Sequence, residues 1–258
     1  MVGFVACLWT LFACPGVAAG QVRASRFGIS DNSFLVEEAF NQEAGIFQNI
    51  FVVSRGRDGT WAGSFTQEWP LRGQRHQGSV TIPFSRDPSS GAMGDAMLNY
   101  RLQVWAGGDG RPAFAPRLSV ILPTSIDRRG LGPGWQVNLP FSFEVGRISV
   151  HANAGMTWLE QNVGPAREWD RTPFAAGSLI IAARPMWHAM LELYTEWPRD
   201  ALAARHQEYT IVPGVRGGWN LGDRQLVVGA GVSITRGATE DTGILMYLSF
   251  ELPFVGRK

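Results

Sequence analysis

The sequence has almost no lysine and almost no cysteine. Its single lysine is Lys258, and its two cysteines, Cys7 and Cys14, both lie within the first 20 residues. The remainder of the chain therefore holds no disulfide, no cysteine metal site and no cysteine nucleophile. With 23 basic and 22 acidic residues, the formal net charge is +1. The chain lacks the basic excess of a nucleic-acid-binding protein, so we expect no nucleic-acid partner.

Long hydrophobic runs are absent beyond the first 20 residues. No later stretch approaches the roughly 18 apolar residues that a membrane-spanning helix needs, which excludes a helical-bundle membrane protein. Residues 1–20 differ, because none is charged and an apolar run, 2–13, precedes a Pro-Gly pair and small residues. This order is typical of a secretory signal peptide, with cleavage after Ala19 or Gly20. A membrane-anchor helix and lipidation of Cys14 are the alternatives.

Known enzyme motifs are absent as well. The chain contains no G-x-S-x-G, H-E-x-x-H, P-loop or dinucleotide-binding pattern, and no helical pattern follows the glycine-rich stretch 130–134 to make it a phosphate site. The four histidines, His76, His151, His188 and His206, are scattered. His151 and His188 fall on a polar strand face, where we expect them to line an interior; a catalytic or metal-binding role is the alternative. We therefore predict no catalytic residue, no metal, no cofactor and no enzymatic activity.

Apolar and polar residues alternate along most of the chain after residue 45. In 135–144 every second residue from Trp135 to Phe143 is apolar, and the residues between them are polar or proline. A period of two residues predicts a β-strand with one apolar face. Clear alternation also occurs in 95–104, 147–158, 187–197 and 225–235. Weaker runs complete a predicted set of twelve strands: 46–54, 60–69, 76–85, 113–122, 173–183, 207–217 and 243–254.

The length of these runs distinguishes a membrane barrel from a soluble sheet. Strands of soluble proteins commonly have about five or six residues, whereas a tilted strand needs roughly 9–11 residues to cross a bilayer. The predicted strands fall in the second class, and tryptophans gather near their ends, as in the interfacial girdles of outer-membrane barrels. We predict an all-β fold, a single antiparallel up-and-down transmembrane β-barrel of about 12 strands, formed by residues 46–258.

The expected connections alternate between short and long. The short ones include 145–146 and 184–185, whereas 123–134 and 159–172 are long and charged. Outer-membrane barrels have short periplasmic turns and long external loops, and an even strand count leaves both termini in the periplasm. The last run alternates up to Phe254, which resembles the signal read by the barrel-insertion machinery. We therefore predict location in a Gram-negative outer membrane, with its lipids and that machinery as partners.

Polar residues on the second strand face would line the barrel interior. Unpaired charges are costly in a confined site, so we expect most of them to form pairs across the lumen. The residues alone leave open whether the lumen is a path for polar solutes or is filled by structural ion pairs. The lumen-lining candidates are Asp95, Arg101, Arg117, Glu144, Arg147, His151, Asn153, His188, Glu192, Glu196 and Arg216.

Residues 21–45 precede the first predicted strand and combine acidic with large apolar side chains. This N-terminal periplasmic segment has three interpretations: a plug that enters the lumen from the periplasmic side, a solvated leader, or an extension of the first strand. The residues that we expect in a plug are Glu37, Glu38, Phe40 and Glu43.

Four stretches resemble the outer-membrane β-barrel family that is named for the meta-pathway of phenol degradation and whose members are also described as transporters. They are 37–43, 94–101, 116–124 and the stretch from Leu139-Pro140 to 151–155. The resemblance covers most of residues 35–160. It implies an outer-membrane barrel that passes small aromatic or apolar compounds, and it supplies no site residues.

Together these observations predict a porin-like channel or transporter for passive passage of small solutes. Residues 21–45 and the loops 123–134 and 159–172 would gate it. The alternative function is a closed structural or adhesion barrel whose external loops bind a partner. An open lumen would favour the channel, whereas fully paired lumen charges and a plugged end would favour the closed barrel.

Overall fold

The computed structural model describes residues 28–29, 31–88, 90–108, 110–163, 166–199, 204–222 and 224–254. The expected signal peptide, 1–20, lies outside the described residues. Within the described part of the chain, no helix is long and apolar enough to cross a membrane.

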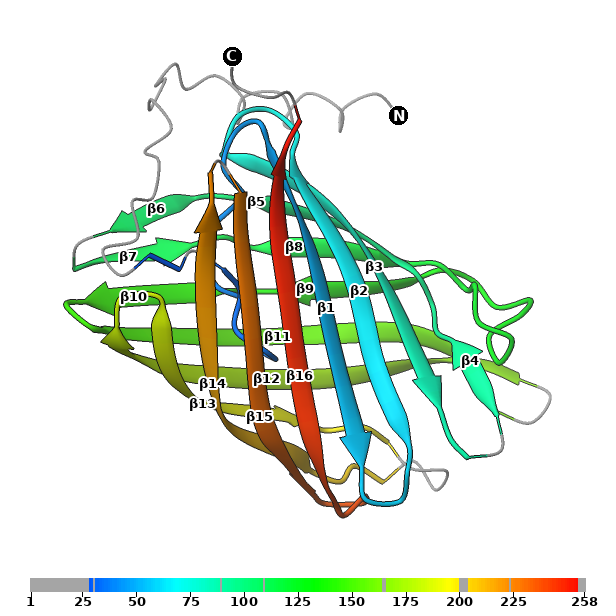
Figure 1. The fold of residues 1–258 in the computed structure, drawn as a ribbon. Coiled ribbons are helices and arrows are strands. Elements are labelled where there is room, and N and C mark those ends of the chain that lie inside the picture. Colours follow the sequence, from blue (N-terminus) through cyan, green and yellow to red (C-terminus); the bar gives the residue numbers. More distant parts are fainter. Residues whose placement is uncertain are drawn as a thin grey trace, which may run out of the picture.

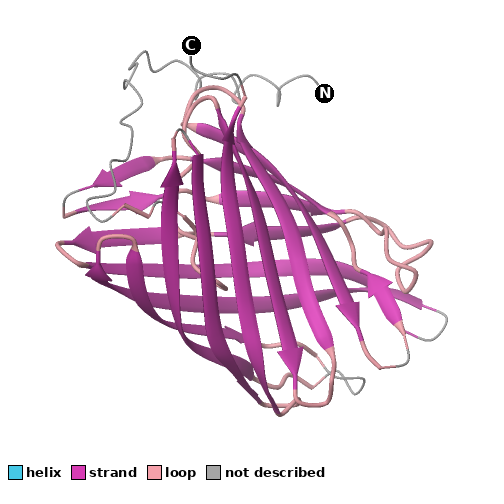
Figure 2. Ribbon diagram, in the orientation of Figure 1, coloured by secondary structure: helices cyan, strands magenta, loops and turns pink. Residues whose placement is uncertain are grey.

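The described residues form sixteen β-strands in one sheet (Figures 1 and 2). Their bounds are β1 (Ile46–Gly56), β2 (Trp61–Pro70), β3 (His76–Arg86), β4 (Gly91–Met93), β5 (Met97–Leu102), β6 (Trp105–Gly108), β7 (Arg111–Phe114), β8 (Arg117–Ile121), β9 (Gly134–Asn138), β10 (Phe141–Val145), β11 (Ile148–Val163), β12 (Ala166–Arg184), β13 (Trp187–Glu196), β14 (Glu208–Leu221), β15 (Arg224–Arg236) and β16 (Asp241–Pro253).

Twelve of these described strands close into an antiparallel barrel. The ring runs β1-β2-β3-β5-β8-β9-β11-β12-β13-β14-β15-β16, and β16 pairs with β1 from Ile46 opposite Pro253 to Gly56 opposite Gly243. The long strand β11 pairs with β12 on one side and with β9 on the other, which completes the ring. The predicted all-β, single antiparallel barrel of twelve strands is confirmed.

Four short strands extend strands of the ring without adding a further strand to it. β4 pairs with β3, while β6, β7 and β10 continue β5, β8 and β9. Pro116 separates β7 from β8, and Pro140 separates β9 from β10, because proline has no N–H to donate to a ladder. The carbonyl oxygens of both prolines still accept hydrogen bonds, from Leu102 and Ala115 respectively. β7 with β8, and β9 with β10, therefore each correspond to one strand predicted from the sequence.

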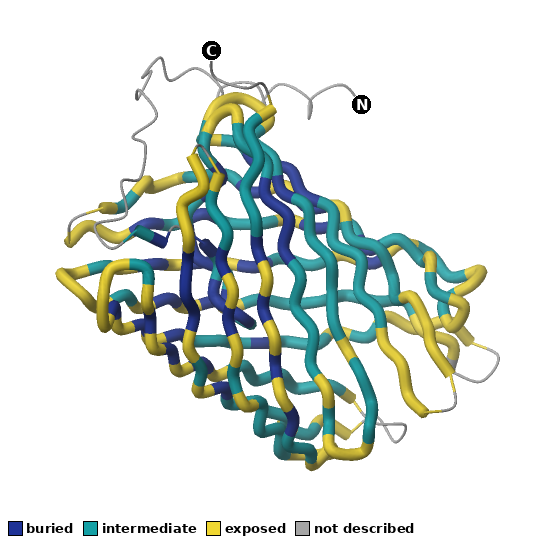
Figure 3. Tube along the Cα trace, viewed as in Figure 1, coloured by how far each residue is buried: buried dark blue, intermediate teal, exposed yellow. Residues whose placement is uncertain are grey.

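Alternation along the strands places apolar side chains outside and polar ones inside. On β13, Leu191 is 50% exposed and the next residue, Glu192, is 0% exposed. Figure 3 shows the same alternation of buried and exposed residues along β14, β15 and β16. Because successive side chains of a strand point to opposite faces, an apolar outer surface and a polar interior follow directly from the sequence period. This is the arrangement of a barrel that faces lipid.

The long connections gather at one end of the barrel. At the end where β1 begins and β16 finishes, which we call the terminal end, β10 and β11 are joined by 146–147 and β12 and β13 by 185–186. The longest connections, 122–133 and 197–207, lie at the other end. This distribution agrees with the predicted one, with a single exception.

The exception is the predicted loop 159–172, which is wrong. β11 and β12 continue through this stretch as a paired hairpin, from Leu159 opposite Asp170 to Val163 opposite Ala166. Residues on both faces of its outer part, such as Gln161 and Arg167, are exposed. A strand with no buried face has no reason to alternate, so the hairpin left no periodic signal in the sequence.

The interior of the barrel holds residues 28–45, which we call the lumen segment (residue 30 is not described). In Figure 1 the blue trace of this segment passes inside the ring of strands. Ile29 and Phe34 pack there against Val212, Val227 and Tyr247 of the wall. A Cβ atom at Gly214 or Gly229 would overlap the Phe34 ring, so these two glycines leave the space that the ring fills. The main apolar cluster of the described residues is therefore built around the lumen segment.

Candidate functional site

The wall binds the backbone of the lumen segment through side chains. Glu192, which is fully buried in β13, accepts hydrogen bonds from the backbone N–H groups of Phe34 (2.8 Å) and Leu35 (2.6 Å). The chain bends at residues 34–36, so two adjacent N–H groups each donate to one oxygen of the same carboxylate. Buried backbone groups need such partners, and here β13 supplies them in place of a β-ladder.

Two further side chains of the wall continue this pattern. Asn153 of β11 accepts from Glu37 N (2.8 Å) through Oδ1 and donates to Glu37 O (2.9 Å) through Nδ2. Ser142 of β10 accepts from Ala39 N at 2.7 Å. Asn153 therefore binds both the N–H and the C=O of Glu37, as a residue of a neighbouring strand would.

Glutamines on the far side of the lumen bind the end of the segment. Gln103 accepts from Asn41 N (2.8 Å) and donates to Ala39 O (2.6 Å). Gln77 of β3 accepts from Gln42 N at 2.6 Å. The contacts of Gln103 and Gln77 bring the segment back to the wall just before β1 begins.

Two buried arginines bind carbonyl groups of the same segment. Arg101 of β5 donates to Glu38 O (3.2 Å) and Phe40 O (2.6 Å). Arg216 of β14 donates to Asp31 O (3.0 Å) and Asn32 O (2.8 Å). Arginine presents several donors in a fixed fork, which suits the capture of successive carbonyl oxygens.

Charges in the lumen are paired between the segment and the wall. Glu37 lies 2.7 Å from Arg117 of β8 and 3.8 Å from Arg101. Glu38 lies 3.3 Å from Arg216 and 3.7 Å from Nε2 of His151 in β11. These pairs join elements that are far apart in sequence, so they fix where the segment lies.

Asp31 is the buried acid at the start of the described segment. Its Oδ1 accepts from Tyr247 Oη (2.6 Å) and Gln48 Nε2 (2.5 Å). Burial raises the pKa of Asp31 to about 6, against the opposing effect of the Arg216 guanidinium. The segment is thus held more firmly when Asp31 is protonated.

The space left beside the segment is small. A cavity of about 20 Å³ is lined by Asp31, Glu38, Gln42, Gln48 and Glu68, among others. That volume holds about one water molecule, far less than an organic solute needs. The segment therefore fills this part of the lumen in the described structure.

Comparison with known families decides the identity of this barrel. The sequence model of the family described as "Putative MetA-pathway of phenol degradation" matches residues 24–244. The chain belongs to this family. The resemblance drawn from the four sequence stretches is confirmed, and the match extends it across nearly the whole barrel. No curated protein matches the sequence.

Solved structures with the fold of this family member are outer-membrane proteins. The COG4313 outer membrane channel from Pseudomonas putida F1 aligns with a TM-score of 0.63 and 12% identity, over 86% of this chain and 98% of the channel. The NanC porin aligns with a TM-score of 0.54 and 7% identity, over 79% of this chain and 98% of the porin. At these identities the similarity shows a shared fold.

In this family member, the sequence-predicted residues fall into two groups. Most of them contact the lumen segment or its partners: Arg101, Arg117, Glu144, His151, Asn153, His188, Glu192 and Arg216 on the wall, and Glu37, Glu38 and Phe40 on the segment. His188 joins this group because Arg216 Nε donates to its Nδ1 at 3.2 Å. The pairing expected across the lumen is therefore largely pairing with the segment.

The second group lies apart from the segment. Asp95 forms an ion pair with Arg128 of the connection 122–133 (3.2 Å), and Glu196 accepts a hydrogen bond from Tyr194 Oη (3.0 Å). Arg147 lies in the exposed turn 146–147 and donates to Ala183 O at 3.4 Å. The sequence places Arg147 in the lumen because the predicted strand begins one residue before β11 does. Glu43 borders a cavity of about 390 Å³ at the terminal end.

The residues that hold the segment and that sequence reasoning missed include Asp31, Gln77, Gln103 and Ser142. The last three stand on polar faces of predicted strands, and that position was the available signal. Uncharged side chains gave no reason to select them over other polar residues. Asp31 lies in the segment itself, where no periodicity exists to show which side chains are buried.

Proposed function

We propose that this protein is an outer-membrane channel for the passive passage of small solutes, and that the lumen segment closes it in the described state. The observation that carries the proposal is how the segment is held. Its backbone is bound by side chains of at least five wall strands and, among the described residues, by no β-ladder within the lumen. Contacts of this kind exchange readily for water, so the segment is removable while the barrel stays intact.

The size of the barrel supports this proposal. Twelve strands spaced about 4.8 Å apart and tilted by about 40° give a diameter of about 24 Å between Cα atoms. Eight-stranded barrels are filled by their own side chains, whereas those of 16 to 18 strands enclose an aqueous channel. A twelve-stranded wall leaves room for about one extended segment, and a solute of similar cross-section would replace it.

The proposed solutes are small, and the family description points to phenols. A phenol combines one apolar ring with one hydroxyl group. Gln77, Gln103 and Asn153 offer donors and acceptors for the hydroxyl once the segment has left, and the pocket of Phe34 offers an apolar surface. The two similar structures are a channel and a porin, which supports transport and leaves the solute open.

The proposal includes the outer membrane as location. The apolar outer surface would contact its lipids, a signal peptide at 1–20 would direct export, and the last strand would present the chain to the barrel-insertion machinery. It also includes the absence of enzymatic activity.

A second candidate is a closed structural or adhesion barrel. One observation favours it: in the described residues the lumen is filled and its charges are paired. The two functions differ in whether the segment ever leaves.

A conductance measurement separates the two candidates. Residues 21–258, refolded into planar bilayers, should give discrete steps, and the chain lacking residues 21–45 should give larger ones. Liposomes that contain the full chain should swell in phenol-class solutes faster than empty liposomes. Proper insertion, shown by heat-modifiable gel mobility, without conductance in either form would support the closed barrel instead.

A further inference from the structure

Two arginines and a tryptophan form a row on the outer face of the barrel, at the end opposite the terminal end. Arg55 of β1 lies opposite Trp61 of β2, and Trp61 lies opposite Arg86 of β3. On its other side Arg55 lies opposite Ile244 of β16, which is exposed on the outer surface. Residues directly opposite each other in an antiparallel pair share a face, so all three side chains point outward. We call Arg55, Trp61 and Arg86 the arginine row.

The apolar outer surface of β1, β2 and β3 ends at the arginine row. Two residues nearer the middle of the wall, the same face carries Val53, Gly63 and Phe84. The Phe84 ring covers Gly63, where an added Cβ atom would meet the ring at 2.7 Å. Further along this face, the rings of Phe51 and Phe65 pack with their centroids 4.7 Å apart. Because aromatic girdles mark the boundary between hydrocarbon and head groups, the row lies at the level of the head groups, next to a surface suited to acyl chains.

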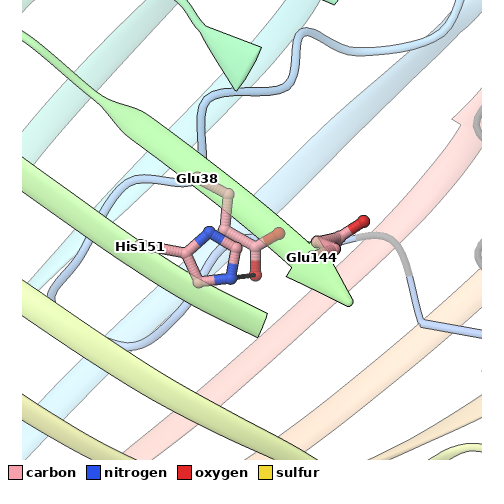
Figure 4. Close-up of side chains that lie close together, drawn as sticks. All are labelled: Glu38, Glu144 and His151. Atoms are coloured by element: carbon pink, nitrogen blue, oxygen red, sulfur yellow. Dashed lines mark ion pairs between the residues drawn. The ribbon is translucent and has the colours of Figure 1, made fainter. Parts of the chain in front are cut away.

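The positive charges of the row are not balanced by the protein. In the interior, ionisable side chains lie beside partners, as Glu38 and His151 do at 3.7 Å (Figure 4). Arg55 and Arg86 are exposed, and within the described part of the chain neither forms an ion pair with a carboxylate. The Arg55 Cζ lies 5.3 Å from the centroid of the Trp61 ring. This cation–π contact orients the guanidinium and leaves its charge available to an anion.

Three acids near this end stabilise turns. Asp58 accepts hydrogen bonds from Thr60 N (2.8 Å) and Oγ1 (2.9 Å). Asp87 accepts from Ser90 N (2.7 Å) and Oγ (2.8 Å) in the turn after β3. Asp241 accepts from a backbone N–H of the turn between β1 and β2 at 3.2 Å. A phosphate outside the protein is therefore a suitable partner for the arginines of the row.

We propose that the arginine row binds the phosphate of a membrane lipid whose acyl chains lie along the apolar outer face of β1, β2 and β3. The planar guanidinium fork matches phosphate oxygens. Two strand spacings separate the Cα atoms of Arg55 and Arg86 by about 10 Å, so a head group that lies over Trp61 contacts both side chains. A free phosphate would make no use of the phenylalanines beside the row. The inference rests on the outer-membrane location in the proposed function, and it does not depend on transport.

Lipid binding is measured by native mass spectrometry on residues 21–258 refolded in detergent micelles. The probe is lipid A, a glycolipid of the outer leaflet that carries two phosphates. It is compared with the same lipid after removal of both phosphates, and inorganic phosphate is added as a competitor. We expect the phosphorylated lipid to bind more tightly than the dephosphorylated one, and we expect inorganic phosphate to leave it bound.

Variants of the row test which residues carry the binding. One arginine beside an anionic lipid is worth about fivefold in affinity, so Arg55→Gln and Arg86→Gln should each weaken binding about fivefold and the double variant about 25-fold. Arg72→Gln is the matched control, because Arg72 is an exposed arginine in the connection between β2 and β3 at the terminal end. It should bind the lipid as the unmodified chain does. Heat-modifiable gel mobility shows that each variant is folded.

The outcomes separate this inference from the proposed function. Equal binding of the two lipid forms would overturn the phosphate site, and so would an equal loss in Arg72→Gln. Displacement by inorganic phosphate would show a site for free anions and would overturn the lipid as ligand. The row lies outside the lumen, so Arg55→Gln/Arg86→Gln should leave single-channel conductance unchanged. Conductance without lipid binding would refute this inference alone, whereas lipid binding without conductance would refute transport alone.

Discussion

The pair of hydrogen bonds between Asn153 and the backbone N–H and C=O of Glu37 gives the sharpest prediction about the lumen segment. Asn153→Ala removes two neutral hydrogen bonds, of 2.8 Å and 2.9 Å, between the wall and the segment. Each contributes about 1 kcal/mol net, so release of the segment becomes easier by about 2 kcal/mol. That difference corresponds to a roughly 30-fold larger released population.

The released population is measured by the rate at which a maleimide labels the thiol of Ser33→Cys, a position that is buried while the segment is bound. The labelling rate of a buried group follows the fraction of molecules in which it is exposed, so Asn153→Ala should raise the rate about 30-fold. Asn138→Ala is the matched control. Asn138 is also a buried asparagine of the wall, and no hydrogen bond found for the described residues joins it to the segment. An unchanged rate in Asn153→Ala, or an equal rise in Asn138→Ala, would refute the reasoning.

Three other changes test separate parts of the structure. Gly229→Ala would overlap the Phe34 ring, so it should weaken binding of the segment by about 1–3 kcal/mol, seen as faster labelling of Ser33→Cys. The pKa of Asp31 is about 6 with the segment bound and near its ordinary value of 3.8 when the segment is released. Binding of the segment is therefore strongest in acid and weakens as pH rises through about 6. The open probability of the channel should rise over the same pH range, and Asp31→Asn should abolish this pH dependence. Leu191→Arg puts a charge on the lipid face of β13 and should lower stability in urea titrations of vesicle-inserted protein by roughly 2–4 kcal/mol, whereas Leu191→Ile should have little effect.

The barrel was predictable because an apolar outer face and a polar interior impose a period of two residues on most strands. Leu191 next to Glu192 shows the principle, since a shift of one residue would put a carboxylate on the apolar outer face. The signal disappears where neither face is buried, so the sequence predicts a loop where the outer hairpin around Gln161 and Arg167 is found. Prolines such as Pro116 and Pro140 divide strands without disturbing the period, so their effect on the ladder was invisible in the pattern.

The course of the lumen segment was not predictable in the same way. Its amides bind side chains distant in the chain, as Phe34 binds Glu192, which lies 158 residues away. Recognition of the backbone places no demand on the side chains of the segment, so no periodicity records it. The acidic residues Glu37 and Glu38 identified the segment as a plug candidate, but the wall residues Gln77 and Gln103 became evident only from the fold.

Conductance of a barrel with the segment locked in place tests the central claim most directly. Ser33 Oγ lies 3.2 Å from Ser178 Oγ of β12, so the double variant Ser33→Cys/Ser178→Cys should form a disulfide that fixes the segment to the wall. We predict low single-channel conductance in the oxidised protein and a reversible increase on reduction, with no response in either single variant. Equal conductance in the oxidised and reduced double variant would contradict the claim that this segment closes the channel.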